Sequence, residues 1–121
     1  MKRDMDLLRS ILIKVESCED PSGLDRMPAV EGYDEAEVSY HMTLLHDAGL
    51  VKALVSDESG APYPEFLQIN LTWDGHEFLS VAKDDSVWKK AREKFLIPVT
   101  KITFDLLLGY LKGMAKEKFG L

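Results

Sequence analysis

The chain has 121 residues, of which 45% are hydrophobic and 30% are charged, and its formal net charge is −6. This length and composition predict one globular domain of ordinary size and exclude an intrinsically disordered chain. No apolar run approaches the ~18 residues of a membrane-spanning helix, and the single cysteine, Cys18, excludes an internal disulfide. We therefore expect a cytoplasmic protein without a membrane segment.

The charge is unevenly distributed along the chain. Residues 1–82 contain 6 Lys or Arg and 16 Asp or Glu, a net charge of −10, whereas residues 83–121 contain 9 and 5, a net charge of +4. A nucleic acid would therefore meet the second segment more readily than the first, because phosphates are attracted to basic side chains.

The first predicted element is an amphipathic helix from about Asp4 to Glu16, because apolar residues recur there at helical spacing. Asp4 is a suitable residue to cap its first turn. After a break, the segment from Leu24 to Val30 is ambiguous. We prefer a short strand to a helix, because Pro28 lies inside the segment.

The central segment predicts a capped helix followed by a two-stranded antiparallel hairpin. Asp34 and Glu37 have the spacing of a capping box, and an apolar stripe at helical spacing follows them. Gly49 is able to adopt the left-handed conformation that ends a helix. Two β-rich runs, residues 50–55 and 66–71, then lie on either side of a loop that contains glycine and proline.

Further helices are predicted after the hairpin. Thr72 is suited to cap the first helix. Asp85 or Ser86 is suited to cap the next, which ends at or just before Pro98. The last helix begins near Thr100 and is apolar on more than one side, so we expect one face to contact another subunit or a partner. The residues predicted for this interface are Phe104, Leu107, Leu108, Leu111 and Met114.

The predicted fold class is α+β, mostly α. A winged helix-turn-helix-like domain, with a helix, a short strand, a capped helix and a two-stranded wing, is expected over residues 1–98, and a C-terminal apolar helix over residues 99–121. A helix-turn-helix needs a helix before its turn, but only a short segment rich in proline and glycine separates Ser17 from Asp34. We therefore expect that helix to be missing or reduced to a turn. Its loss weakens any function in which it would hold a phosphate backbone.

Several sequence motifs resemble known families. VSYHMTLLHDAGLV resembles the recognition helix and first wing strand of winged-helix transcription regulators, and INLTWDGHEFL resembles their second wing strand and the next helix. From MKRDMDLLRSIL through GYDEAEVSYHMTLLHDAGLV to LTWDGHEFLSVAKDDSVWKKAREK, the chain resembles a family seen in phage and prophage genomes, the domain of unknown function twenty-five thirteen. This resemblance covers nearly the whole chain and implies a fold but no activity.

No strong catalytic or metal-binding motif is present. The sequence has no Gly-rich phosphate loop, no His-Glu-x-x-His and no Cys-x-x-Cys. His41 and His46 are five residues apart on one predicted helix, so their side chains diverge, and we expect His41 to be half-buried with one hydrogen bond. Trp73, His76 and Glu77 have two interpretations: they line a small cleft at the base of the wing, or Trp73 packs on the sheet. We prefer the second. We therefore expect no enzyme activity, no catalytic or metal-binding residue and no cofactor.

A DNA-binding function would rest on the resemblance in fold, and the charge of the central helix opposes it. From Tyr33 to Leu50 there are four acidic residues and no Lys or Arg, whereas a groove-reading helix supplies basic side chains to phosphates and bases. The basic residues gather instead between Lys83 and Lys94. The candidate nucleic-acid contacts are Ser39, Tyr40, Thr43, His46, Lys52, Lys89, Lys90 and Arg92.

The competing function is a protein-interaction module that keeps a winged-helix scaffold without a DNA-binding surface. Its acidic central region would bind a basic partner, and its last helix would form a homodimer. We therefore predict a non-catalytic, regulatory module that acts through protein–protein interaction. The alternative is a DNA-binding transcriptional regulator.

Overall fold

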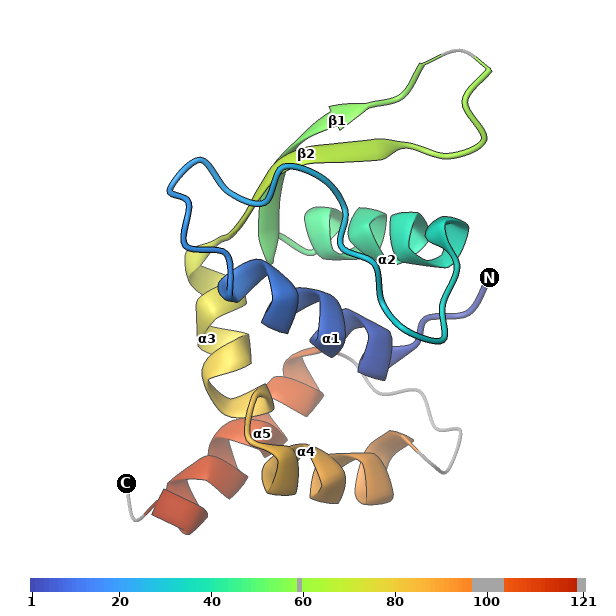
Figure 1. The fold of residues 1–121 in the computed structure, drawn as a ribbon. Coiled ribbons are helices and arrows are strands. Elements are labelled where there is room, and N and C mark those ends of the chain that lie inside the picture. The colour runs from blue at the N-terminus through green and yellow to red at the C-terminus, as the bar shows by residue number, and fades with distance from the viewer. Residues whose placement is uncertain (59, 97–103, 120–121) are drawn as a thin grey trace. The chain divides into compact units, whose positions relative to one another are not determined.

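The computed structural model describes residues 1–58, 60–96 and 104–119. Within these ranges five α-helices and two β-strands give an α+β fold that is mostly helical, as predicted (Figure 1). They are α1 (Met5–Glu16), α2 (Glu35–Asp47), β1 (Val51–Ser56), β2 (Glu65–Leu71), α3 (Trp73–Ala82), α4 (Asp85–Ala91) and α5 (Phe104–Phe119). The chain forms two compact units, Met1–His76 and Glu77–Leu121.

Asp4 begins helix α1, as the sequence predicted. Its Oδ1 accepts hydrogen bonds from the backbone N–H groups of Asp6 and Leu7, at 2.9 and 3.2 Å, which satisfies two of the donors that a helix leaves free in its first turn. One face of α1, including Leu7 and Ile11, is fully buried. This face forms the centre of the first unit, where α1 contacts α2 and β2.

Helix α2 begins with the predicted capping box. The N–H of Glu37 donates to Asp34 Oδ1 at 2.8 Å, and the N–H of Asp34 donates to Glu37 Oε1 at 3.2 Å. Gly49 follows the end of the helix with a φ of +75°, the left-handed conformation that glycine adopts without steric cost. The helix buries Met42 and Leu45 in the core of the first unit.

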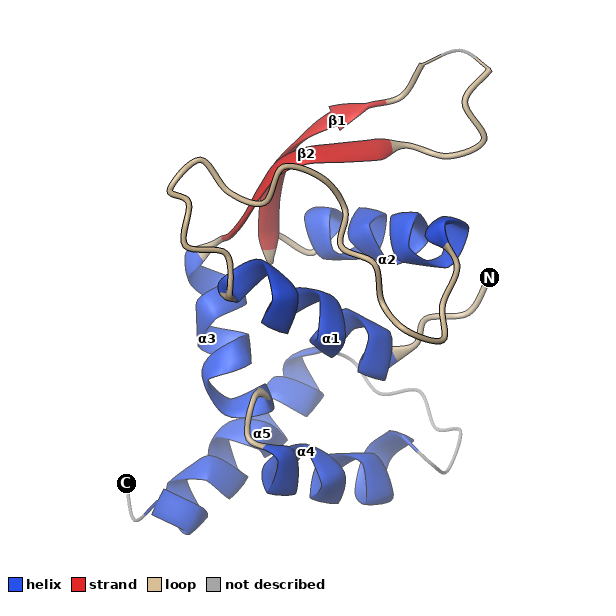
Figure 2. Ribbon diagram, viewed as in Figure 1, coloured by secondary structure: helices blue, strands red, loops and turns tan. Residues whose placement is uncertain are grey.

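Strands β1 and β2 form the predicted antiparallel hairpin (Figure 2). The register runs from Val51 opposite Leu71 to Ser56 opposite Glu65. It shifts in the middle, where β2 has one residue more than β1 and Gln68 takes a φ of +50°. A bulge of this kind bends a strand and increases its twist.

The predicted strand from Leu24 to Val30 is reduced to a single residue. The N–H of Leu24 donates to the Ile69 carbonyl in β2 at 2.9 Å, and the N–H of Ile69 donates to the Leu24 carbonyl at 2.8 Å. The rest of the segment pairs with no strand, and Pro28 has no N–H to donate to a neighbouring strand. Position 23 requires glycine because the backbone of β2 lies close to it. A Cβ at this position would lie 2.6 Å from the Ile69 carbonyl oxygen. Residues 17–34 contain no helix, as the proline and glycine content of this segment predicted.

Thr72 and Gly75 join the end of the hairpin to the turn after α2. The N–H of Thr72 donates to the Leu50 carbonyl at 3.0 Å, and the Thr72 hydroxyl donates to the Gly49 carbonyl. Thr72 also caps α3, as predicted, by accepting the N–H of Gly75 at 3.1 Å. A Cβ on Gly75 would lie 2.0 Å from the Leu50 carbonyl oxygen, so no larger residue fits without a backbone shift.

The second unit contains helices α4 and α5, which pack against each other. Asp84, one residue before the predicted cap, begins α4 by accepting the N–H groups of Ser86 and Val87, both at 3.0 Å. After Ala91 the chain continues as a π-helical turn over Arg92–Leu96. In the core of this unit the rings of Phe78 and Trp88 pack edge to face, with their centroids 6.3 Å apart.

Two sequence expectations fall on residues 97–103, outside the part of the chain that the structure describes. These are the helix end at Pro98, with the domain boundary beside it, and the helix start near Thr100. The compact units separate earlier, between His76 and Glu77, so α4 groups with α5. None of the described helices combines the length and apolar composition needed to cross a bilayer.

Candidate interaction site

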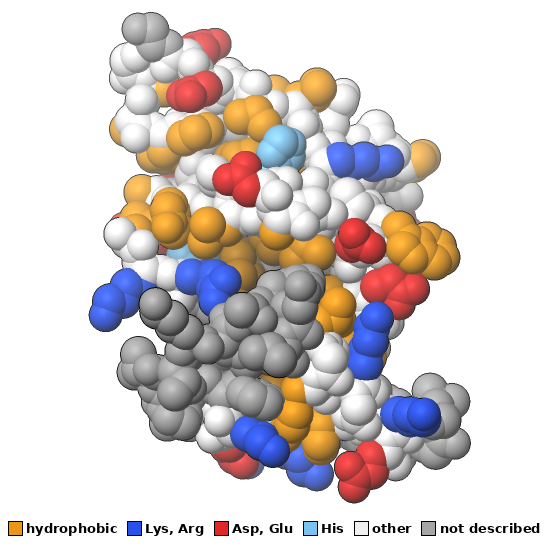
Figure 3. Space-filling view, turned by 180° about the vertical axis from the view of Figure 1, so that it is seen from behind, with side chains coloured by type: hydrophobic (Ala, Val, Ile, Leu, Met, Phe, Trp, Pro, Cys, Tyr) orange, Lys and Arg blue, Asp and Glu red, His pale blue; other side chains and the backbone are white. Residues whose placement is uncertain are grey.

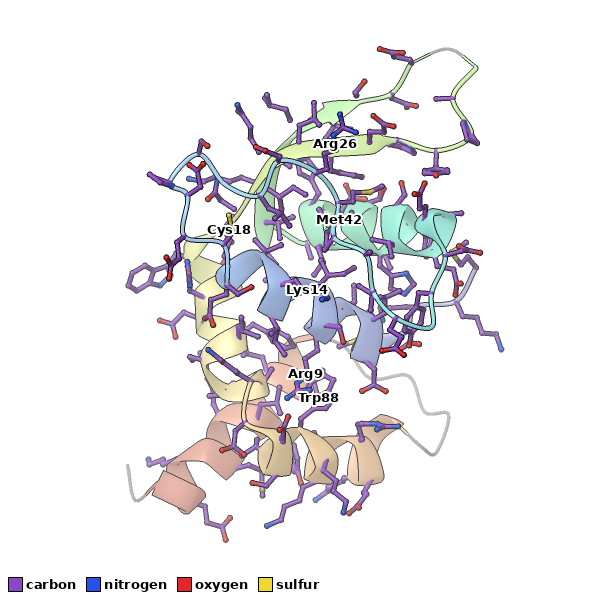
Figure 4. The ribbon with its side chains drawn as sticks, in the orientation of Figure 1. Arg9, Lys14, Cys18, Arg26, Met42 and Trp88 are labelled. Atoms are coloured by element: carbon purple, nitrogen blue, oxygen red, sulfur yellow. The ribbon has the colours of Figure 1, made fainter. Side chains whose placement is uncertain are left out.

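A pocket of about 210 Å³ opens on the first unit between the N-terminal half of α2, strand β2 and the segment before α2. It is lined by residues 26–30 and 33–35, Val38, Tyr63 and residues 65–67. Figure 4 labels Arg26 beside β2, where the 26–30 segment passes the strand. Every lining residue belongs to the first unit, so the pocket is defined within one compact body.

One wall of the pocket is the chain that enters β2, and α2 holds it in place. Ser39 is fully buried in α2, and its hydroxyl donates to the Pro64 carbonyl at 2.6 Å. The Tyr63 hydroxyl donates to the Glu35 carboxylate one helical turn earlier. This hydrogen bond raises the pKa of Tyr63.

Another part of the pocket lining is Tyr33, which directly precedes Asp34, the N-cap of α2. Its hydroxyl donates to Asp4 Oδ2 at 2.7 Å, and this carboxylate raises the pKa of Tyr33 to about 12. Its N–H closes a turn on the Val30 carbonyl at 3.1 Å, with Gly32 at a φ of +88° between them. The segment before α2 is therefore tied to the start of α1 as well as to α2.

The pocket combines an apolar floor with an acidic rim. Val30, Val38 and Phe66 are buried, whereas the charged lining residues are exposed. Those charged residues are Asp34, Glu35 and Glu65 on the acidic side and Arg26 on the basic side. Three carboxylates against one guanidinium give the opening a negative potential, which favours a cationic group.

The predicted nucleic-acid contacts on α2 and β1 have different accessibilities. The Ser39 hydroxyl is used inside the unit, as described above, and the half-buried Thr43 hydroxyl donates to the Ser39 carbonyl at 3.1 Å. Tyr40, His46 and Lys52 are exposed. The α2 positions available to an outside molecule are therefore fewer than the sequence predicted, and α2 contributes no Lys or Arg to them.

The remaining predicted nucleic-acid contacts lie in the second unit. Lys89, Lys90 and Arg92 are exposed on α4 and the π-helical turn. Nearby, the Lys94 ammonium lies 5.3 Å from the centre of the Tyr110 ring, a cation–π contact with α5. The acidic side chains of Asp57 and Glu58, by contrast, lie exposed near the tip of the hairpin, where Figure 3 shows red side chains.

The residues of the predicted oligomer interface on α5 differ in burial. Leu107 and Leu111 are fully buried within the chain. Their burial follows from the packing of α5, since a helix apolar on two sides covers its own core with one of them. Leu108 and Met114 are half-buried, and the side chain of Phe104 lies outside the described part.

His41 is a structural residue, more deeply buried than the sequence predicted. Its Nε2 accepts the N–H of Asp4 at 2.8 Å, so the proton is on Nδ1, which donates to the Glu37 carbonyl at 2.8 Å. Both ring nitrogens are thus used. Among the described residues, no three His, Cys, Asp or Glu side chains are grouped to hold a metal ion.

Trp73 corrects another sequence expectation. It was expected to pack on the sheet, but its side chain is 78% exposed at the first position of α3. Gly75 brings the start of this helix against the Leu50 carbonyl, and Trp73 lies on the side that remains open. The cluster with His76 and Glu77 therefore forms no enclosed cleft around the indole.

The pocket residues Arg26, Tyr33, Tyr63 and Glu65 were not identified from the sequence. A weak signal was present, since Tyr33 directly precedes a helix cap and Tyr63 lies between two prolines, which restrict the backbone. Their assembly depends on the Ser39–Pro64 hydrogen bond, which joins positions 25 residues apart. Such a contact has no counterpart in local sequence patterns.

Comparison with known proteins identifies relatives by sequence and not by structure. The family described as "Hypothetical protein (DUF2513)" matches residues 2–97. An "Uncharacterized protein" of Haemophilus influenzae (strain ATCC 51907 / DSM 11121 / KW20 / Rd) is 36% identical over 116 residues, which cover 96% of this chain and 93% of the relative. No solved structure matches.

Proposed function

This chain belongs to the family described as "Hypothetical protein (DUF2513)", and we propose that it is a non-catalytic protein-interaction module. The observation that carries this proposal is the pocket of about 210 Å³ beside α2, with its apolar floor and acidic rim. Concave sites with buried apolar side chains and a polar border are typical of surfaces that recognise a partner.

The order of the elements in the first unit supports the same proposal. Helix α2 is followed by the β1–β2 hairpin, the order of a recognition helix and wing, but residues 17–34 form no helix. Four acidic residues and no Lys or Arg lie between Tyr33 and Leu50. A phosphate backbone would meet repulsion along this helix, whereas a basic protein surface would be attracted. A regulatory, phage-associated role is the biological setting that the resemblance of the motifs favours.

The proposal is tested by photo-crosslinking at the pocket. A photoactivatable residue replaces Leu67, which lines the pocket, and in a matched variant it replaces Lys14, which is exposed on α1. Irradiation in a lysate is expected to give a discrete protein adduct from position 67 and none from position 14, and Glu65→Lys should abolish it. Equal labelling from both positions, or crosslinking to nucleic acid alone, would contradict the proposal.

The alternative is a DNA-binding regulator, favoured by the exposed Tyr40, His46 and Lys52 on α2 and β1. It predicts binding to a generic duplex at low salt that falls steeply as salt rises, because phosphate contacts release counterions. Fluorescence anisotropy with a labelled duplex measures this directly. We expect no binding by the wild-type chain, and binding that Lys52→Ala weakens would favour the alternative.

A further inference from the structure

The pocket beside α2 has the size of a site for one side chain. Its volume of about 210 Å³ is several times the ~30 Å³ that one water molecule occupies and below the ~300 Å³ at which pockets for drug-sized ligands begin. This volume suits a long side chain from another protein. The pocket therefore selects for a side chain, and its lining indicates which kind.

The floor is suited to the aliphatic stem of that side chain. Val38 and Phe66 are buried beneath the opening, and the half-buried Met27 and Leu67 border it. Methylene groups that leave water for such a surface gain hydrophobic free energy. Lysine and arginine bury their methylene groups in this way while the charged end stays near water.

The rim is suited to a positive charge at the end of that stem. Glu35 and Glu65 are exposed carboxylates at the opening, and Tyr33 and Tyr63 add two aromatic rings to the walls. Carboxylates accept hydrogen bonds from ammonium and guanidinium groups, and aromatic faces attract them. Tyr33 and Tyr63 each donate a hydrogen bond from the hydroxyl to a carboxylate, Asp4 and Glu35 respectively, which raises the pKa of both phenols.

We infer that this pocket binds a lysine or arginine side chain presented by a partner protein. The inference rests on the proposed function and names the chemistry of the partner. Of the charged lining residues, Arg26 alone disfavours such a ligand, whereas three carboxylates favour it. The same carboxylates disfavour a phosphate or an acidic peptide, so charge complementarity decides between the two kinds of occupant.

The test uses small probes that isolate the charge. The amides of Nα-acetyllysine and Nα-acetylarginine are titrated to millimolar concentration into the full chain labelled with nitrogen-15. The amides of Nα-acetylnorleucine and Nα-acetylcitrulline are the matched neutral probes. Saturable shifts are expected at the backbone amides of Val38, Tyr63 and Phe66 with the two basic probes, and weaker shifts with the neutral ones.

Substitutions then measure how much each charged side chain of the pocket contributes to binding of the basic probes. Glu65→Gln and Glu35→Gln are each expected to weaken binding of the basic probes by about two- to fivefold, the range of an exposed ion pair. Arg26→Gln should strengthen it by about twofold, because a like charge is removed. Glu58→Gln, an exposed carboxylate outside the pocket lining, is the matched control and should change nothing.

The possible results distinguish a failure of this inference from a failure of the proposed protein-interaction function. Equal binding of basic and neutral probes, shifts outside the pocket, or loss of binding with Glu58→Gln to the same extent overturns the inference. If the crosslink at position 67 still captures a protein, the interaction function survives and the pocket takes a different side chain. If the basic probes bind but position 67 crosslinks no protein, the pocket's chemistry stands and the proposed function fails.

Discussion

At the scale of single residues, Asp4 joins three segments of the first unit. Its carboxylate caps α1 through Oδ1 and accepts the Tyr33 hydroxyl through Oδ2, and its own N–H donates to the buried ring of His41. Position 41 is 37 residues away, so these bonds connect the start of the chain to α2. The side chain thus contributes both to the helix and to the wall of the pocket.

Asp4→Ala is expected to lower the free energy of unfolding by about 2 kcal/mol, because it removes a helix cap and the partner of the Tyr33 hydroxyl. Asp4→Asn should lose about half as much, since its amide oxygen still accepts hydrogen bonds. Urea unfolding followed by circular dichroism measures both. Asp57→Ala, exposed near the hairpin tip, is the control. An Asp4→Ala loss no greater than that of the control would contradict this role.

The Tyr33 hydroxyl predicts a response to alkaline pH. The folded chain holds the pKa of Tyr33 at about 12, above the value of about 10 of an unfolded chain. The pair therefore contributes its stability fully below pH ~10, and this contribution is lost as the pH rises towards 12. Tyr33→Phe should remove a transition near pH 12 from an ultraviolet absorbance titration and flatten this alkaline loss of stability. If the transition that Tyr33→Phe removes lies near pH 10 and not near pH 12, the hydrogen bond to Asp4 does not form in solution.

At the scale of elements, the connection between α2, the hairpin and α3 depends on close backbone approach. The carbonyl oxygen of Leu50 accepts a hydrogen bond from the N–H of Thr72 and lies against Gly75. The two ends of the hairpin are thereby held at one point. Helix α3 begins there, so its direction at the start is set by this contact.

Gly75→Ala is expected to destabilise the chain by about 2–3 kcal/mol, because the new methyl group would overlap the Leu50 carbonyl oxygen. Gly109→Ala in α5 is the matched control, since it has nothing within 4 Å of the added Cβ. It should stabilise the helix by up to about 1 kcal/mol. Thermal unfolding of both variants measures the difference. Destabilisation by Gly109→Ala would instead indicate that another chain covers this side of α5.

The elements also show where local patterns failed. Caps at Asp4 and Asp34 and the hairpin around the proline-containing loop were predictable, because each depends on neighbours in sequence. The strand expected at Leu24–Val30 is reduced to one paired residue, Leu24 opposite Ile69. Local propensity indicated an extended segment but not the extent of its pairing.

At the scale of the whole molecule, the predicted interface on α5 depends on which of its side chains are buried. Leu107 is fully buried, whereas its neighbour Leu108 is half-buried. An interface on α5 would therefore have to use the Leu108 side and leave Leu107 to the core. The two adjacent positions separate a folding effect from an association effect.

Leu107→Glu is expected to unfold the second unit, because a carboxylate placed in the core loses its hydration. Leu108→Glu should keep the fold, because that side chain reaches solvent. Near-ultraviolet circular dichroism of Trp88, which packs on Phe78, reports the fold, and light scattering reports the mass. A folded Leu107→Glu variant that changes only in mass would restore the interface that the sequence predicted.

The sequence by itself determined the features that neighbouring residues control. These were the mostly helical α+β class, the caps of α1 and α2, the left-handed Gly49, the antiparallel hairpin and the missing helix between residues 17 and 34. Family membership likewise follows from the order of residues alone. Each feature depends on backbone geometry and spacing over a few positions, which the chain carries before it folds.

Only the tertiary structure decided which side chains are buried and which meet. It buried Ser39, His41 and Leu107, exposed Trp73, and brought Tyr33 and Tyr63 to one pocket. The physical reason is that burial depends on partners far away in sequence, as Ser39 depends on Pro64 and His41 on Asp4. A helical stripe predicts that a face will be covered, but the partner that covers it is chosen only when the elements pack.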